Sequence, residues 1–442
     1  MTRFIHLSII FLLPVLFSCS SPSSLPEEKS AAAVNTGQTP NRIEPKDDAI
    51  LTKSPLLVAD VINFVVENSP SLKASQAKWN AAKTRAVQMS TPEDPSVSVY
   101  RMKEMEATKT GLVLEQKFTS SGKLDVQGKV AEQEAKIAQQ EFIIQRFNLI
   151  AQAKSAYYDL FWANQVVRIN QEVKELISNT EKIAELQYAT GTGNQQDVLQ
   201  AQIELARINN EITTLERLKE TAMASLNKIL NRSASAPLGV PSEITIKPLA
   251  STLEQLTERA MEHNPELKAA GLEIDKNKRF IDLANKQFYS DFMVSAEYDR
   301  YSYRPGGLPG KNGWAAGIGI NIPLWQEKYK AAVREAEAQT RASRESQQSA
   351  KNNTEFAVKD ISVRIVNAWK VLELYQNNLI PQAEQLLIVS QTSYQTGKTG
   401  FIDVLNGNRL ILDLKLGFYQ AQVDYKKALA ELEAVCAFSI EE

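Results

Sequence analysis

The chain of 442 residues has very few of the side chains from which catalytic and metal sites are usually built. Its only histidines are His6 and His263, and its only cysteines are Cys19 and Cys436. Zinc sites, disulfide frameworks and histidine-based catalytic triads therefore lack the residues they need. We expect neither an enzyme nor a resident cofactor.

The charge of the chain is nearly balanced, with 50 basic and 52 acidic residues and a formal net charge of -2. A nucleic-acid-binding protein would show a basic excess, so nucleic acid is not an expected partner. Beyond the N-terminus, no apolar run reaches the roughly 18 residues that a membrane-spanning helix needs. These shortages exclude a helical membrane protein with several spans.

The N-terminus has the pattern of an export signal. Arg3 precedes a mostly apolar run from Ile5 to Phe17, which is too short to cross a bilayer. The run ends in Leu16-Phe17-Ser18-Cys19, which resembles the bacterial lipoprotein signal, in which the cysteine is acylated. An ordinary signal peptide with an incidental cysteine is the alternative.

This signal predicts how the mature chain begins. We expect residues 1–18 to be removed and Cys19 to be anchored in outer-membrane lipid. Residues 19–55 are rich in Ser, Pro, Glu and Asn and low in hydrophobic residues, so we expect them to form a flexible tether.

The remainder of the chain contains one unit twice. A Tyr-x-Thr-Gly turn followed by Asp-Val-Leu runs from Tyr188 to Leu199 and returns, 206 positions later, from Tyr394 to Leu405. Upstream, Pro70 begins a short pattern that Pro265 repeats 195 positions later. The chain therefore divides into a first repeat over residues 56–231, a proline-rich linker over 232–250 and a second repeat over 251–442.

Within each repeat, apolar residues follow a seven-residue period. Residues 123–189 contain no proline and carry one heptad position at Val130, Ile137, Ile144, Ala151 and Tyr158. At about 1.5 Å per residue, this helix would be on the order of 100 Å long. The last helix of the second repeat has the same period at Val404, Ile411, Phe418, Tyr425 and Leu432. Such periods predict long coiled-coil hairpins, with the core stripe of a globular bundle as the alternative.

Four shorter segments are predicted to be strands, at about 95–103, 110–118, 291–303 and 313–323. The last alternates apolar residues such as Ile318 and Ile320 with small or polar ones, so one face is apolar. Segments of this kind are typical of a membrane β-barrel wall, and a soluble sheet packed on helices is the alternative. Each repeat thus reads helix, two strands, long helix, tight turn and helix, in a mainly α fold with a membrane β-barrel portion.

Four strands in one chain cannot close a barrel. A closed barrel needs about eight strands or more, and open strand edges are not tolerated in lipid. Several copies of the chain would therefore have to combine. Two copies would give eight strands around an interior filled by side chains, and three would give twelve strands around a pore. The residue pattern leaves the number of copies open.

The turn that occurs twice carries a resemblance to a known family. Over residues 56 to 438, the chain resembles the TolC-like outer-membrane efflux proteins. This resemblance implies a homotrimer with a twelve-stranded barrel in the bacterial outer membrane and an α-helical coiled-coil tunnel in the periplasm. It also implies two partners, a periplasmic adaptor protein and an inner-membrane transporter, most often of the resistance-nodulation-division type.

A second set of residues resembles one branch of this family, the outer-membrane lipoproteins of heavy-metal efflux systems. The matching positions in the first repeat are Pro92, Asp94, Pro95, Gln116, Phe118, Gly122 and Lys123. In the second repeat they are Asp291, Phe292, Ile322, Pro323 and Leu324. Glu93, Lys117 and Thr119 depart from the pattern of that branch. This resemblance favours cobalt, zinc, cadmium or copper ions as the substrate.

The repeated turns also carry the predicted site. Gly191 and Gly397 suit the left-handed conformation that ends a helix, and Asn194 can cap the helix that follows. The resemblance places both turns at the periplasmic tip, where the adaptor would contact the tip residues Thr190, Gly191, Thr192, Thr396, Gly397 and Lys398. It further implies a constriction gate formed by Asp403, Asn406, Tyr394, Asp197 and Lys398. Asp403 would form an acidic ring, and Tyr394 would bond Asp197 to hold the gate closed.

The expected function is the exit duct of a tripartite efflux pump. A type I protein-secretion duct of the same fold is the alternative, and a lipid-anchored coiled-coil scaffold without a pore is a further one. The amphipathic strand pairs argue against the scaffold. The energy source must lie in the transporter, because this sequence contains no nucleotide-binding motif.

Lipidation of Cys19 can be tested directly. Mass spectrometry of the mature protein should show an acylated N-terminal cysteine, and replacing Cys19 with Ala should leave the leader uncleaved at this site. A mature N-terminus at any other residue would rule out the lipid anchor.

Overall fold

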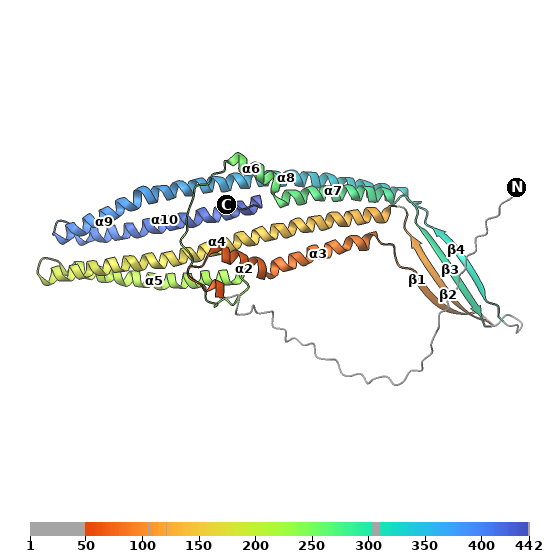
Figure 1. Ribbon diagram of the computed structural model, residues 1–442, viewed down its shortest axis with the longest axis horizontal. Helices are drawn as coiled ribbons and strands as arrows, with labels where there is room; N and C mark the ends of the chain where they lie inside the picture. Colours follow the sequence, from red (N-terminus) through yellow and green to blue (C-terminus); the bar gives the residue numbers. More distant parts are fainter. Residues whose placement is uncertain (1–48, 105–106, 121, 303–309, 441–442) are drawn as a thin grey trace, which may run out of the picture. The chain divides into compact units, whose positions relative to one another are not determined.

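The computed structural model describes residues 49–104, 107–120, 122–302 and 310–440, in two repeats of the same element order (Figure 1). The first comprises α2 (Val58–Asn68), α3 (Pro70–Ser90), β1 (Ser96–Glu104), β2 (Ala107–Phe118), α4 (Lys123–Ala189) and α5 (Gln195–Ile229). The second comprises α6 (Leu253–His263), α7 (Pro265–Lys286), β3 (Phe292–Tyr301), β4 (Gly313–Ile320), α8 (Gln326–Leu374), η1 (Tyr375–Leu379), α9 (Ile380–Gln395) and α10 (Phe401–Cys436). Among the described helices, none has both the length and the hydrophobicity needed to cross a bilayer.

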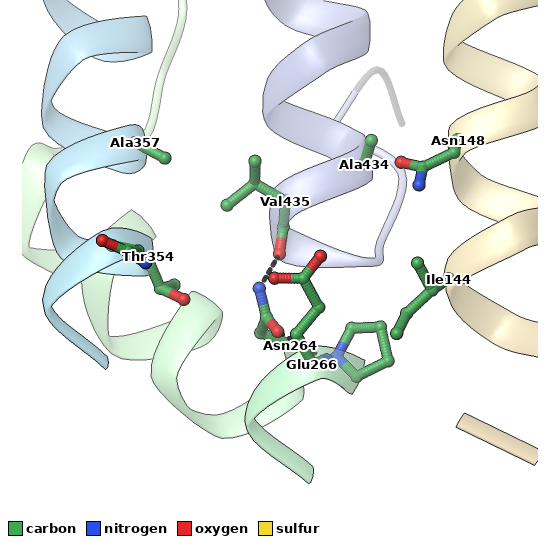
Figure 2. Close-up of a pocket in the computed structure, with 10 residues that line it drawn as sticks. Ile144, Asn148, Asn264, Glu266, Thr354, Ala357, Ala434 and Val435 are labelled. Atoms are coloured by element: carbon green, nitrogen blue, oxygen red, sulfur yellow. Dashed lines mark hydrogen bonds between the residues drawn. The ribbon is translucent and has the colours of Figure 1, made fainter. Parts of the chain in front are cut away.

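The first helical segment of each repeat is divided by a polar residue followed by proline. Ser69 accepts a hydrogen bond from the backbone N–H of Leu72, and the Asn264 side chain accepts two, from Glu266 and Leu267. Proline suits the first helical turn because its missing N–H would have no partner there. The Asn264 amide also donates to the carbonyl of Val435 at 2.9 Å, beside a cavity of about 200 Å³ (Figure 2). This cap therefore ties α7 to the end of α10.

The long helix differs between the repeats. In the first, α4 runs unbroken for 67 residues, as its proline-free heptads predict. In the second, α8 passes into the π-helix η1 before α9. Pro381 lies in the first turn of α9 and cannot donate to the turn before it, so the backbone there adopts a wider turn. Tyr375 of η1 packs on Gly417 of α10, where an added Cβ would lie 2.5 Å from the tyrosine oxygen.

The four strands form one antiparallel sheet in the order β1-β2-β3-β4. The central ladder, between β2 and β3, joins the two repeats and runs from Lys109 opposite Tyr301 to Phe118 opposite Phe292. Compared with the predicted segments, β2 begins earlier, at Ala107, and β4 ends earlier, at Ile320. Within the described residues, β1 and β4 are each paired on one side only.

The two faces of this sheet differ in polarity. One face is apolar and exposed, with Val97, Val99, Leu112, Leu114, Phe118, Phe292, Val294, Tyr298, Trp314, Ile318 and Ile320. The other face carries polar and small residues, among them a cluster in which Lys109 lies 2.8 Å from Asp299. The Tyr100 hydroxyl lies 2.9 Å from Asp299 and also contacts Glu297, and the ring covers Gly111. The ladders thus place β1, whose sequence does not indicate a face, with Val97 and Val99 on the apolar side.

The helical core lies where both repeats meet. Tyr157 of α4 and Tyr425 of α10 are fully buried, and each hydroxyl donates to the carbonyl of an extended segment, Leu56 at 2.8 Å and Lys247 at 2.6 Å. Lys154 of α4 and Glu433 of α10 form an ion pair whose side chains are less than a tenth exposed. The Glu433 carboxylate also accepts from the backbone N–H of Ile440, so the buried charges are paired.

The predicted tether extends too far into the chain. Its first part, up to residue 48, lies outside the described residues. In the rest, Leu51 is fully buried in the core around α2 and α4, and its carbonyl accepts from the N–H of Gly239 at 2.8 Å, whereas the other residues from 49 to 55 are exposed. An apolar residue with a core position available to it does not remain in a solvated linker.

Candidate gate at the helical tips

Each helical hairpin ends in the repeated turn. Gly191, between α4 and α5, and Gly397, between α9 and α10, have φ angles of 76° and 71°, which confirms the predicted left-handed helix ends. In both turns the next residue donates back to the helix, Thr192 to the carbonyl of Gln187 at 2.9 Å and Lys398 to that of Ser393 at 2.8 Å. The predicted cap at Asn194 is wrong in part, since Asn194 stands at the N-cap position but its side chain makes no capping bond.

The structure brings Tyr394 and Asp197 together. The Tyr394 hydroxyl donates to Oδ2 of Asp197 at 3.2 Å, and the ring is buried edge-on against Phe401. Gln187 of α4 donates to the carbonyl of Tyr394 at 3.2 Å. Burial, and then the charge of Asp197, raise the pKa of the Tyr394 hydroxyl, so it remains a donor. These bonds join the α4–α5 hairpin to the α9–α10 hairpin.

The other predicted gate residues lie on exposed surface. Asp403 is in the first turn of α10, and Asn406 follows one turn later on the same face. Lys398 is exposed in the turn. The Thr190 and Thr192 hydroxyls lie 3.0 Å apart, and both contact the Gln187 carbonyl. One chain presents a single Asp403, so an acidic ring would require further copies.

A second bond between the hairpins was not predicted. Glu204 of α5 accepts two bonds from Arg409 of α10, from Nε at 3.2 Å and from Nη2 at 2.7 Å, and a third from Arg207 at 2.9 Å. The Glu204 side chain is only 5% exposed. It lies seven residues after Asp197, about 10 Å along α5. The heptad pattern could not reveal this pair, because periodicity within a helix does not show which helix lies beside it.

The charge of Glu204 depends on this pairing. Burial alone would raise the pKa of its carboxyl, but the hydrogen bonds and charge of Arg409, followed by those of Arg207, outweigh it and lower the pKa. The pair borders a cavity of about 320 Å³ between α4, α5 and α10. In the same wall, the Asn170 amide donates to its own helix, and its buried Oδ1 has no hydrogen-bond partner. The contact between the hairpins is therefore packed less completely here than in the core.

Metal ligands are not gathered at the tips or elsewhere in the described residues, where no group of three or more His, Cys, Asp or Glu side chains could hold an ion. The cysteine of α10, Cys436, is fully buried, and burial raises the pKa of its thiol to about 12. Cys436 is thus a core residue.

Comparison with known proteins shows the family. The outer membrane efflux protein family matches residues 61–232 and 256–437, one match for each repeat, and the chain belongs to this family. The predicted resemblance to TolC-like outer-membrane efflux proteins is thereby confirmed.

Individual relatives are distant in sequence. The chain is 19% identical over 408 residues to the cobalt-zinc-cadmium resistance protein CzcC of Cupriavidus metallidurans, covering 91% of this chain and 92% of CzcC. Among solved structures, CusC superposes with a TM-score of 0.74 at 14% identity, over 88% of this chain and 93% of CusC. The outer membrane protein VceC of Vibrio cholerae gives 0.72 at 18% identity, over 87% and 97%. These structures show that the fold is shared.

Stability at low pH should report on Glu204. Because the pKa of Glu204 is lowered on folding, its contribution is present above the unfolded pKa, near 4.5, and is lost as the pH falls through the folded value. Replacing Glu204 with Gln should cost about 1–3 kcal/mol at pH 7, and the difference from wild type should shrink below pH 4.5. Thermal unfolding followed by circular dichroism at both pH values measures this.

Glu211, an exposed carboxylate on the same helix, provides the matched control. Glu211→Gln should leave the midpoint unchanged at either pH. The pair does not hold the hairpins together if Glu204→Gln has the same unfolding midpoint as wild type at pH 7. The same conclusion follows if its midpoint lies as far below that of wild type at low pH as at pH 7.

Proposed function

We propose that the chain is the outer-membrane exit duct of a tripartite efflux pump. The observation that carries this proposal is a sheet with one exposed apolar face, joined directly to helical hairpins whose longest helix has 67 residues. Such a helix extends on the order of 100 Å from the sheet. The function of the family supports the assignment, and efflux requires a path across the membrane.

The apolar face has the dimensions and composition of a lipid-facing wall. Phe118 and Phe292 are cross-strand partners at one end, and Tyr298 and Trp314 at the other. The two pairs lie six positions apart along β3, which is roughly 20 Å. A membrane barrel has an apolar band about 25 Å tall between two aromatic girdles. We assign the opposite face, with Lys109 and Asp299, to a water-filled interior.

A homotrimer supplies the strands that one chain lacks. The described sheet has two edges with unpaired backbone groups beside an apolar face, which lipid does not tolerate. Three copies give twelve strands and a pore, whereas an eight-stranded barrel is filled by side chains. The lipid anchor at Cys19 would add a second attachment to the outer membrane.

The tips of the hairpins would form the gate. Three copies of Asp403 near the threefold axis, with Asn406 one turn away, would attract cations and disfavour anions. The Tyr394–Asp197 and Glu204–Arg409 bonds would keep the hairpins together in the resting duct. An adaptor would separate them by binding the tip residues Thr190, Gly191, Thr192, Thr396, Gly397 and Lys398. An inner-membrane transporter of the resistance-nodulation-division type would supply the energy.

Heavy-metal cations are the proposed substrate. CzcC is named for resistance to cobalt, zinc and cadmium, and the segment from Pro92 to Lys123 resembles the heavy-metal branch. Within that segment, Lys123 reaches across to Asp291 of the second repeat at 2.8 Å, so two positions of the branch pattern are in contact. Cation attraction by an Asp403 ring fits the same substrate class.

The gate predicts a change in conductance. Replacing Tyr394 with Phe and Asp197 with Ala removes a charge-assisted bond typically worth about 1.5–3 kcal/mol in each subunit. The double variant should conduct more in planar bilayers and should make cells permeable to large antibiotics. Asp403→Ala should reduce cation selectivity.

Tyr188, which holds the place of Tyr394 in the first repeat and is half exposed, is the matched control. Tyr188→Phe should conduct like wild type. A double variant that stays trimeric and as closed as wild type would reduce Tyr394 and Asp197 to helix-end residues.

The substrate class can be tested in cells. Deleting the gene should lower tolerance to one or more of cobalt, zinc, cadmium, copper and silver, and expression of the wild-type chain should restore it. Growth inhibition across a metal series and a drug series measures this. Unchanged metal tolerance with lost drug tolerance would assign the duct to drug efflux instead.

A further inference from the structure

The chain, made of two repeats, has two outer sides that no other described part of it covers. Strand β1 and helix α3 lie on one side, and β4 and α8 on the other. The inner boundary, where β2 and α4 of the first repeat meet β3 and α7 of the second, is complete. Since the chain is built of two like units, this inner boundary is a template for what should meet the outer sides.

The inner boundary is closed by an ion pair at the ends of the strands. Nζ of Lys123, the first residue of α4, lies 2.8 Å from Oδ1 of Asp291 and 2.8 Å from the carbonyl oxygen of Tyr289. The same Asp291 oxygen accepts from the backbone N–H of Ser120 at 2.8 Å. The Lys123 and Asp291 side chains are 10% and 20% exposed. This pair locks the end of β2 to the start of β3.

Contacts between helices show which residue of α8 corresponds to Lys123. On α4, Gly128 faces α3 near Ser90, and Phe142 stacks on Trp79. On α8, Ser343 accepts from Asn277 of α7 at 2.6 Å, Gln347 approaches Gly271 of α7, and Tyr329 packs on Phe288 just after α7. These three residues lie 205 positions after Ala138, Phe142 and Leu124, which share the helical face of Gly128 on α4. The π-helix η1 takes up the one additional residue before the tip, where the offset is 206. The counterpart of Lys123 is therefore Lys328.

Helices α3 and α7 differ in how many of their faces are covered by other helices. One face of α7 packs on α8, and a second packs on α4, where Lys286 approaches Gly122. Along that second face Ala269, Leu272 and Lys276 are partly buried. The corresponding residues of α3, 195 positions earlier, are Ala74, Ala77 and Ala81, and all three are exposed. The face of α3 that α4 does not cover thus matches a face that α7 buries.

The charges at the two outer sides are complementary. Asp94 lies just before β1, as Asp291 lies just before β3, and it is exposed with no ion pair in the described part of the chain. Its neighbour Glu93 is already paired with Lys117 at 2.8 Å. At the other side, Lys330 is paired with Glu327 at 3.0 Å, whereas Lys328 has no carboxylate partner among the described residues. One unpaired acid and one unpaired base therefore stand at equivalent places on opposite sides.

We propose that Lys328 of one copy binds Asp94 of the next copy, repeating between subunits the Lys123–Asp291 bond within each. Strand β4 of the first copy then pairs with β1 of the second, and α8 covers the open face of α3. This inference rests on the proposed trimeric duct and adds which side chains join its subunits. Because β1 and β4 are three strands apart in one sheet, at roughly 14 Å, the two residues cannot meet within one chain.

Cysteine cross-linking tests the pair. The full chain carries Cys436→Ser together with Asp94→Cys and Lys328→Cys and is treated in detergent with a short bismaleimide. Denaturing gels should show covalent dimers and trimers. The matched control is Lys123→Cys with Asp291→Cys, the equivalent pair within a chain, which should link without a gain in mass. Each chain that carries only one of the two introduced cysteines should remain monomeric on the gel, which excludes links through Cys19.

Charge reversal gives a second measurement on the same pair. Asp94→Lys alone and Lys328→Asp alone should each lower the temperature at which the trimer dissociates, and the combined variant should recover most of the loss. A trimer that forms while Asp94→Cys and Lys328→Cys stay unlinked, with the control pair linked, would overturn the proposed contact and leave the duct standing. A wild-type chain that is monomeric in detergent would overturn the trimer itself.

Discussion

The ladder between β2 and β3 is the interaction on which the rest of the structure depends. It pairs residues that are far apart in sequence, Phe118 with Phe292 and Lys109 with Tyr301, and it is the only strand pairing between the repeats in the described sheet. Once it forms, the start of α4, which follows β2, and the end of α7, which precedes β3, must lie side by side. Lys123 and Asp291 then come within bonding distance. A four-stranded sheet with a continuous apolar face follows from two hairpins that would each be only marginally stable alone.

Far from the sheet, the repeats are held by a different kind of contact. In the core, Tyr157 and Tyr425 bury large side chains, and Lys154 pairs with Glu433 out of solvent. Toward the tips, the hairpins are joined by a smaller apolar cluster, with Ala184 and Ala201 from the first hairpin and Phe401 and Val404 from the second. Polar bonds of Tyr394 and Glu204 add to it. Apolar burial is not directional and resists separation over a wide area, whereas a hydrogen bond is lost over a short displacement. The chain is thus joined in its middle by large buried side chains, and at the end where a gate would act by a smaller apolar cluster together with polar bonds.

Much of the architecture could be predicted because it follows from the local periodicity of the sequence. The heptads from Val130 onward and the lack of proline indicate the long helix, and Gly191 and Gly397 mark where hairpins turn. Features that depend on contacts between distant segments could not be predicted this way. The Glu204–Arg409 pair needs the knowledge that α5 and α10 are neighbours, and the apolar face of β1 becomes clear only when its ladder with β2 is known. The contact of Tyr394 with Asp197 came from family resemblance and was not deducible from spacing.

The π-helix at Tyr375–Leu379 makes the two hairpins mechanically unequal. A wide turn next to Pro381 has fewer regular helical bonds than its surroundings, and such places are where long helices bend. The first repeat has no counterpart, since α4 is continuous past the same level. Under a force applied at the tips, the α9–α10 hairpin would bend at the π-helix, whereas the α4–α5 hairpin would stay straight. Two repeats of the same element order thereby differ in stiffness, because the long helix of the second contains one more residue at the π-helix.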